Sequence, residues 1–444
     1  MAFIRGEARG QGTMFPVTLD ELIPEDHICR VIEAFVGRVD MAGLEFVRAE
    51  AAETGRPGYD PRDLLKLYLY GYLQPVRSSR RLEAECKRNV EVMWLLGRLQ
   101  PDHKSVAEFR RLNSVAITGT CAELVSFARS VGLVRGEWVA IDGSKFQAVS
   151  SAARVAERDA AKRYLDGLDA ADQQEEMVID ETAVAEALKK LQQDREPEVR
   201  FMRGPQGKVP GYNVQLAVDS EHAIVVVQQV TSEANDVHSL LPLAEAAKAA
   251  VGNPAVLHVV ADAGYSNGEQ AEACEQKGIV PHVPAQRGNN NQGDGTLLDR
   301  SQFSYDAARD RFTCPAGERL TRKGVPKDRH RVIYQASAQA CGACWLKARC
   351  TRARRRTVYR HVHEEALTRM QQRATPQAMR LRRCCAEHPF ASLKYWIFGH
   401  PRFLLRGRRG AQSEMSLAVL SYNLKRMLHV LGSALLIRKL APAE

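Results

Sequence analysis

A series of short β-rich runs most constrains what this chain can fold into. GYNVQLAVD (211–219) and AIVVVQQV (223–230) are separated by three polar residues, which predicts an antiparallel hairpin. VLHVVAD (256–262) and GIVPHV (278–283) are each preceded by a segment of helical pattern. Strands alternating with helices predict an α/β fold, in which a mixed sheet of about four strands is buried between helices.

Two of the predicted strands carry an aspartate at or near their end. VLHVVAD ends in Asp262, and EWVAIDGSKFQAV (137–149) is a short apolar run that ends in Asp142. An Asp before a Gly-containing turn often only caps a helix or closes a loop, and this is the ordinary alternative for Asp262. If the two strands are neighbours, however, the carboxylates lie side by side and repel each other unless a cation compensates. Hard oxygen ligands of this kind suit Mg²⁺ or Mn²⁺.

A third carboxylate, Glu387, lies in a helical stretch near the C-terminus, RRCCAEHPFASLKYWIFGH. Arg383 precedes it by four residues and Lys394 follows it by seven, on nearly the same helical face. The alternative is an ordinary surface ion pair. Aromatic side chains interleaved with basic ones, Trp396 among them, favour contact with phosphates and unstacked bases. Three carboxylates at one point would complete a two-metal site for phosphodiester displacement.

Residues 20–130 have a helical pattern with repeated start signals. Asp60-Pro61, Ser78-Ser79 and Asp102 each precede such a segment. Three short helices this close are compatible with a helix-turn-helix-like unit. The basic side chains of this unit would face DNA phosphates. The alternative is a solvated surface, which charged residues on short helices commonly form. The basic residues are Arg80, Arg81, Lys87, Arg88, Arg110 and Arg111.

The basic charge is concentrated in the last third of the chain. The whole chain has a net charge of +10, and residues 300–444 hold 30 Lys and Arg against nine Asp and Glu. This pattern predicts a nucleic-acid partner, because each neutralised phosphate releases condensed counterions. The N-terminal sequence MAFIRGEARGQGTMF lacks the apolar core of a signal peptide. The sequence also contains no apolar run long enough to predict a membrane span. We therefore expect a cytoplasmic protein without a membrane partner.

Four cysteines lie within this basic region. Cys314, Cys341, Cys344 and Cys350 combine one CxxC with two outlying residues, which is the count for a tetrahedral zinc site. The outer spacing is loose, so buried or free thiols are the alternative. The basic run that follows, RCTRARRR, favours a DNA-facing role.

Taken together, several stretches resemble the DDE transposases of bacterial insertion sequences, which have an RNase H-like catalytic domain. They are GRPGYDPRDLLKLYLYGYLQPVRSSRRLEAECKRN, PDHKSVAEFRR, AIDGSKFQA, GYNVQLAVD, ADAGYS and EHPFASLKYW. The resemblance implies that Asp142, Asp262 and Glu387 bind the catalytic metals. It also places Arg383 and Lys394 in the family's signature around the glutamate, whereas Arg380 occupies the position of its tyrosine.

The resemblance also suggests the organisation of the chain. We expect a helical module that binds DNA ends (1–134), a first catalytic part (135–284) with a helical insertion (151–205), a basic four-cysteine insertion (285–375), and a second catalytic part with a C-terminal helix (376–444). The predicted activity is metal-dependent cleavage and strand transfer at the element's terminal inverted repeats, into target DNA, by a homo-oligomer. A stand-alone endonuclease and a non-catalytic DNA-binding derivative are the alternatives.

Overall fold

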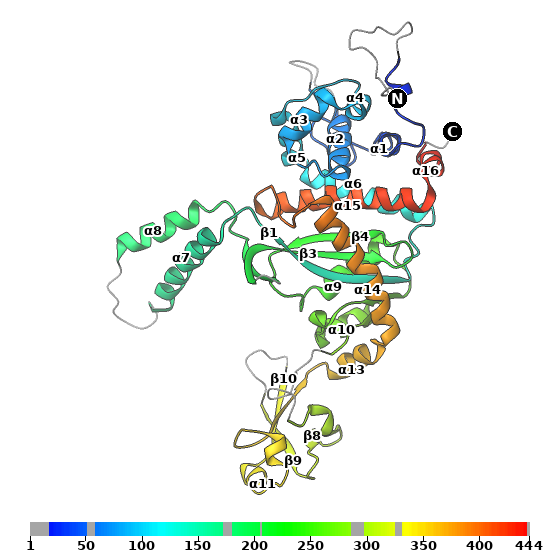
Figure 1. Cartoon of the computed structure of the whole chain (residues 1–444). Helices are drawn as coiled ribbons and strands as arrows, with labels where there is room; N and C mark the ends of the chain where they lie inside the picture. Colours follow the sequence, from blue (N-terminus) through cyan, green and yellow to red (C-terminus); the bar gives the residue numbers. More distant parts are fainter. Residues whose placement is uncertain are drawn as a thin grey trace, which may run out of the picture. The chain divides into compact units, whose positions relative to one another are not determined.

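The computed structural model describes residues 17–50, 58–171, 180–204, 207–285, 297–324 and 331–441. The Gly-Asn-rich stretch RGNNNQGDG and the Met1–Phe15 segment lie outside the described residues. The chain forms two compact units (Figure 1). Unit 1 comprises Met1–Leu124, Ser392–Leu405 and Arg409–Glu444, and unit 2 comprises Val125–Ala391 and Arg406–Arg408. Among the described helices, none is both long and apolar enough to cross a membrane.

Unit 2 is built on a six-stranded mixed sheet. Its strands are β1 (Trp138–Gln147), β2 (Arg200–Gly204), β3 (Gly207–Asp219), β4 (Val225–Thr231), β5 (Leu257–Val260) and β6 (Ile279–His282). The order along the sheet is β2-β3-β1-β5-β6, with β4 also paired to β3. β3 pairs antiparallel with β1 and β4, whereas β1, β5 and β6 run parallel. The predicted mixed α/β fold with an antiparallel hairpin is confirmed, and it is that of an RNase H-like domain.

Helices cover this sheet and extend from it. They are α9 (Leu240–Ala250), α10 (Gly268–Gln276), α13 (Glu364–Arg373) and α14 (Pro376–Ala391), with the pair α7 (Ala152–Ala171) and α8 (Glu181–Gln192) between β1 and β2 (Figure 1). The segment expected to be a purely helical insertion therefore ends in a strand. β2 forms there because Arg200–Gly204 pairs with the start of β3.

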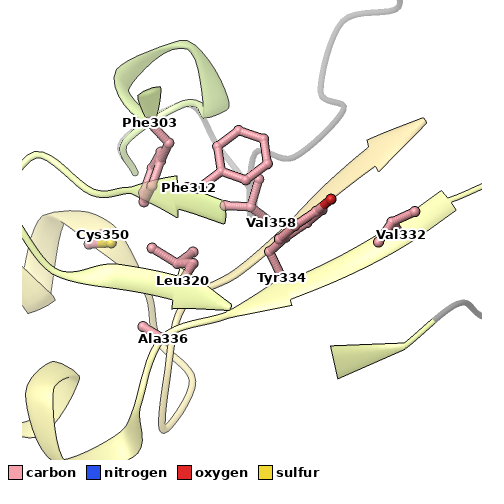
Figure 2. Packing of buried hydrophobic residues seen from close by; sticks show 8 residues of the cluster. All are labelled: Phe303, Phe312, Leu320, Val332, Tyr334, Ala336, Cys350 and Val358. Atoms are coloured by element: carbon pink, nitrogen blue, oxygen red, sulfur yellow. The ribbon is translucent and has the colours of Figure 1, made fainter. Parts of the chain in front are cut away.

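A second, smaller sheet forms within residues 300–361. It consists of β7 (Ser304–Asp306), β8 (Arg311–Thr313), β9 (Arg319–Gly324), β10 (Arg331–Gln335) and β11 (Thr357–His361), all antiparallel. Two short helices, α11 (Ala338–Gly342) and α12 (Lys347–Cys350), lie between β10 and β11. The sheet has its own hydrophobic cluster (Figure 2), to which we return below.

Unit 1 is helical. Its N-terminal helices are α1 (Ile28–Gly37), α2 (Pro61–Leu73), α3 (Ser79–Arg88), α4 (Val90–Leu95), α5 (His103–Leu112) and α6 (Ser114–Ser130), the last of which continues into unit 2. Asp60 and Asp102 cap α2 and α5 as predicted, each accepting a backbone N–H. A π-helical turn (Ser392–Ile397), α15 (Gly407–Leu431) and α16 (Ser433–Leu440) complete the helical segments of this half of the chain.

Candidate active site

The parallel pairing of β1 with β5 sets the level of the two aspartates. Ala140 pairs with Val260, so Asp142 and Asp262, each two residues further on, lie at the same level of adjacent strands. Asp142 is in the middle of β1, and the expectation that it nearly ends the strand is wrong. The strand continues to Gln147 because it remains paired with β3.

Asp262 caps a short helix directly after β5. It follows β5 and caps a short 3₁₀ helix (Ala263–Tyr265), where Oδ1 accepts the Gly264 N–H at 2.8 Å. The capping alternative is therefore correct as a local description. It leaves the remaining lone pairs of the carboxylate available, so capping does not exclude ligand binding.

Helix α14 brings Glu387 to the same face of the sheet. Ala378, Cys385 and Ala386 pack in one buried cluster with Ala140 of β1 and Val260 of β5. Ala140 and Asp142 are two residues apart and share a face of the strand, so Asp142 faces α14. Cys385 of the unusual cysteine pair thus has a packing role, whereas its neighbour Cys384 is exposed.

An arginine spans two of the acids. Arg382 places Nη1 3.6 Å from Oδ2 of Asp142 and Nη2 4.0 Å from Oε1 of Glu387. Sequence reasoning assigned the basic role to Arg383, which is exposed in the structure. The basic side chain that pairs with the acids is therefore one position earlier in α14 than predicted. Cys385 and Ala386 pack on the sheet, and this packing determines which side of the helix is buried.

Asp142 lies in an environment that disfavours its charge. Burial raises its pKa to about 6; the carboxylates of Asp262 and Asp236 also act to raise it, and the Arg382 guanidinium acts in the opposite direction. A carboxylate whose charge is disfavoured by burial and by neighbouring carboxylates is stabilised by added positive charge.

Asp236 is a site residue that sequence reasoning missed. It lies in the loop before α9, and its Oδ1 accepts hydrogen bonds from Nδ2 of Asn213 (2.7 Å) and Nε2 of Gln215 (2.6 Å). Lys145 of β1 places Nζ 3.6 Å from the same oxygen. The adjacent dipeptide Asn235-Asp236 after a strand was the one available signal, and it is too common in turns to have been diagnostic.

The packing around this group is tight. A Cβ added at Gly143, next to Asp142, would lie 2.5 Å from Nε2 of Gln215 and 2.8 Å from Oδ1 of Asp236. Tyr265 is fully buried and donates its hydroxyl proton to Oε1 of Gln215. Asp236 is thus fixed by a buried hydrogen-bond network directly beside Asp142.

The donor set fits a hard divalent cation. The acids supply only carboxylate oxygens, and two buried cationic atoms beside them, Nζ of Lys145 and Nη1 of Arg382, make no hydrogen bond. The clustered carboxylates suit Mg²⁺ or Mn²⁺, whereas the two cationic atoms suit an anion such as a DNA phosphate. Asp142, Asp262 and Glu387 are the residues that could hold the divalent cation, and their oxygens, like those of the other described acids near them, do not form a set of three within 4.8 Å of one another.

The basic residues predicted to contact DNA have different environments. Arg80 and Arg81 are exposed on α3, while Lys87 and Arg88 pair with Glu83 and Glu85 of the same helix. Arg110 is buried, with its guanidinium over the Tyr68 ring, so the prediction that it faces phosphates is wrong.

Lys394 and Trp396 lie in the π-helical turn, which belongs to unit 1. Trp396 packs against Lys425, whose Nζ is 3.2 Å from the ring centroid. One ring face is therefore already covered by a cation, and this contact limits how Trp396 could stack on a base.

Comparison with known proteins identifies the family of the chain. The family described as Transposase DDE domain matches residues 171–424, more than half of the chain, and the family described as Transposase domain (DUF772) matches residues 17–112. No curated protein matches. A solved structure, the cryo-EM structure of piggyBac transposase synaptic complex with hairpin DNA, is similar at 10% identity and a TM-score of 0.29, covering 94% of this chain and 86% of that chain. By its family match the chain is a member of the DDE-domain transposases.

Proposed function

We propose that this transposase cuts DNA at the ends of an insertion sequence and joins the freed 3′ ends to target DNA, using Asp142, Asp262 and Glu387 as its catalytic acids. The observation that carries this proposal is the register of β1 and β5, which sets Asp142 level with Asp262 on the face covered by α14. Glu387 is linked to Asp142 there through Arg382.

The three carboxylates would hold Mg²⁺ or Mn²⁺. When bound, the metal supplies the charge that activates an attacking oxygen and stabilises a leaving one in phosphodiester chemistry. The protein's own contribution is position: Asp142 and Asp262 are fixed by strand pairing and a helix cap. Glu387 is exposed on α14, the helix whose Cys385 and Ala386 pack on the sheet. No nucleophilic side chain is required.

Three further residues would support these acids without replacing them. Lys145 and Arg382 offset the negative charge of the cluster, and Asp236 keeps Lys145 and the strand β3 amides in place. They are positioning residues: Arg382 acts on the acids through ion pairs, Lys145 acts through its nearby charge, and Asp236 acts through Lys145.

DNA binding would draw on both units. We propose that the helical module containing Arg80 and Arg81 binds the terminal inverted repeats, with exposed Arg383 on α14 as a phosphate contact closer to the acids. Lys394 and Trp396 are further candidates for contact with the DNA end. Strand transfer of two ends into one target would require a homo-oligomer on DNA.

A joining assay separates this function from that of an endonuclease. DNA that carries the sequence flanking the gene, labelled at the end, is incubated with the protein, Mg²⁺ and a circular target. We expect cleavage at the element's end and transfer of label to the target, both lost in Asp262→Asn and both retained in Glu269→Gln, an exposed acid on α10. Cleavage without transfer would indicate an endonuclease, and unchanged activity of Asp262→Asn would refute the choice of acids.

A further inference from the structure

The four cysteines of the smaller sheet surround one small cavity. Cys314, Cys341, Cys344 and Cys350 line it together with Lys347 and Arg356, and its volume is about 20 Å³. That space holds roughly one water-sized sphere. The cysteines come from three places in the chain, namely the turn after β8, helix α11 with its C-terminal end, and helix α12. None of them is in a disulfide.

We propose that this cavity is a structural Zn²⁺ site with four cysteine ligands. Four thiolates are the commonest donor set of closed structural zinc sites, and a single CxxC with two further cysteines supplies it. The proposal is independent of the catalytic acids, because no residue is shared between the two sites.

Local backbone structure orients two of the cysteines. After Cys314 the chain turns back at once: Gly317 N–H donates to the Cys314 carbonyl, and Cys314 N–H donates to the Glu318 carbonyl, both at 2.9 Å. Gly317 has φ +83°, a conformation that favours glycine. Cys341 Sγ accepts the Arg356 N–H at 3.4 Å, and backbone N–H groups directed at sulfur stabilise thiolate charge.

The charge around the cavity complements four bound thiolates. Zinc with four thiolates carries a net charge of about −2. Arg356 is buried, with Nη1 2.7 Å from the Cys350 carbonyl and its guanidinium over the Phe303 ring. Lys347 lines the same cavity. Holding two cationic side chains next to neutral thiols costs free energy. A negatively charged metal–thiolate group would offset this cost.

The surrounding core is small, which gives a metal a structural role. Its buried members are Phe303, Phe312, Leu320, Val332, Tyr334, Ala336, Cys350 and Val358 (Figure 2). Cys314 and Cys341 pack against this cluster. Sheets this short bury too little apolar surface to be rigid without a further crosslink, and a bound metal commonly provides one.

Metal binding must also draw the sulfurs together. Sulfurs in a zinc–thiolate tetrahedron are about 3.7 Å apart. Among the described residues, the one set of three potential ligand atoms within 4.8 Å of one another is His27, Cys29 and Glu91 in unit 1. The four sulfurs are therefore spaced more widely than in a closed site. The set in unit 1 is a rival location for a bound metal, and the test must separate the two.

The test measures zinc in the full-length protein, purified without chelator and with zinc supplied, by elemental mass spectrometry. We expect about one zinc per chain in the wild type, less than a tenth of that in Cys344→Ser, and the wild-type content in Cys384→Ser and Cys29→Ser. Cobalt exchanged into the wild type should give the intense near-ultraviolet absorption of thiolate ligation, and Cys344→Ser should not.

A second variant guards against misfolding. Cys344→His keeps a zinc ligand, so it should retain zinc and solubility even if Cys344→Ser is insoluble. Wild-type protein without zinc would overturn the proposal. So would full zinc content in Cys344→Ser, or loss of zinc in Cys29→Ser with retention in Cys344→Ser, which would assign the metal to unit 1.

Discussion

Two carboxylates next to arginines, the buried Glu414 in unit 1 and the half-buried Asp142 in unit 2, have different hydrogen-bond environments. Glu414 is fully buried, and its Oε1 accepts the backbone N–H groups of Leu404 (2.7 Å) and Leu405 (2.6 Å). Its Oε2 accepts from Nη1 of Arg77 at 3.1 Å. Asp142 accepts one N–H, that of Gly143, and Arg382 stays 3.6 Å away.

The difference is between an acid with hydrogen-bond partners on both oxygens and an acid that could still bind a ligand. Burial raises the pKa of Glu414, but each of its oxygens accepts a hydrogen bond within the protein, and these bonds oppose the effect of burial. Asp142 retains lone pairs and lies beside other acids, which makes the charged form costly until a cation arrives. Substitutions at these two acids and at their neighbours test this contrast.

Glu414→Gln should destabilise unit 1 strongly. It removes one charge from a buried group that includes Arg77 and Arg110, and breaking such a group costs about 3–5 kcal/mol. Urea unfolding followed by circular dichroism measures the free energy of unfolding. Glu198→Gln, at a half-exposed ion pair with Arg408, serves as the control and should cost less than about 1 kcal/mol. If Glu414→Gln lowers the free energy of unfolding by less than about 1 kcal/mol, Glu414 does not have the structural role that separates it from Asp142.

Asp142→Asn should instead increase the free energy of unfolding in magnesium-free buffer. Because the pKa of Asp142 is raised to about 6, its protonated form contributes stability that is present below about pH 4 and is lost as the pH rises through about 6. The variant lacks this loss, so at pH 7.5 it should be more stable than the wild type by about 2–3 kcal/mol and should keep only about 1 kcal/mol of this advantage at pH 4.5. Greater stability of the wild type at pH 7.5 would contradict the account.

Asp236→Asn should weaken divalent-metal binding while preserving the fold. The amide oxygen can still accept from Asn213 and Gln215, but the charge that faces Lys145 is lost. Outer-shell changes of this kind cost about tenfold or more in metal affinity. Calorimetric titration with Mn²⁺ measures this, and Asp236→Glu should recover part of the affinity. Unchanged affinity in Asp236→Asn would leave Asp236 with a purely structural role.

Replacing both Arg80 and Arg81 by Ala should weaken DNA binding and leave metal binding by the acids unchanged. Each lost phosphate contact lowers the slope of log affinity against log salt by about 1, so the double variant should lose about 2. Fluorescence anisotropy with terminal-repeat DNA at several salt concentrations measures the slope. Lys87→Ala, whose ammonium is already paired with Glu83, is the matched control, and an equal loss there would remove the special role of Arg80 and Arg81.

The sequence predicted the strands and their alternation with helices because local periodicity and composition determine these features. It also led us to expect that two strand-borne aspartates and a helical glutamate form one metal site, and this grouping stays a prediction. What it missed depends on tertiary pairing: β2 exists because it pairs with β3, and Asp142 lies within β1 because the same partner extends that strand.

The choice of individual site residues shows the same limit. Arg382 faces the acids and Arg383 does not, since the side of α14 that packs on β1 is determined by tertiary contacts. Arg110 is buried because it packs on Tyr68 near Glu414, which is distant in the chain. Asp236 is held by amides of β3, and no local pattern encodes that contact.

The most direct test of the metal site is the change in melting temperature on adding Mn²⁺ to the wild type, Asp262→Asn and Glu414→Gln. The account predicts a rise in the wild type and in Glu414→Gln, because metal binding to the folded acids stabilises them, and no rise in Asp262→Asn. An equal rise in Asp262→Asn and the wild type would contradict the claim that these acids hold the catalytic metal.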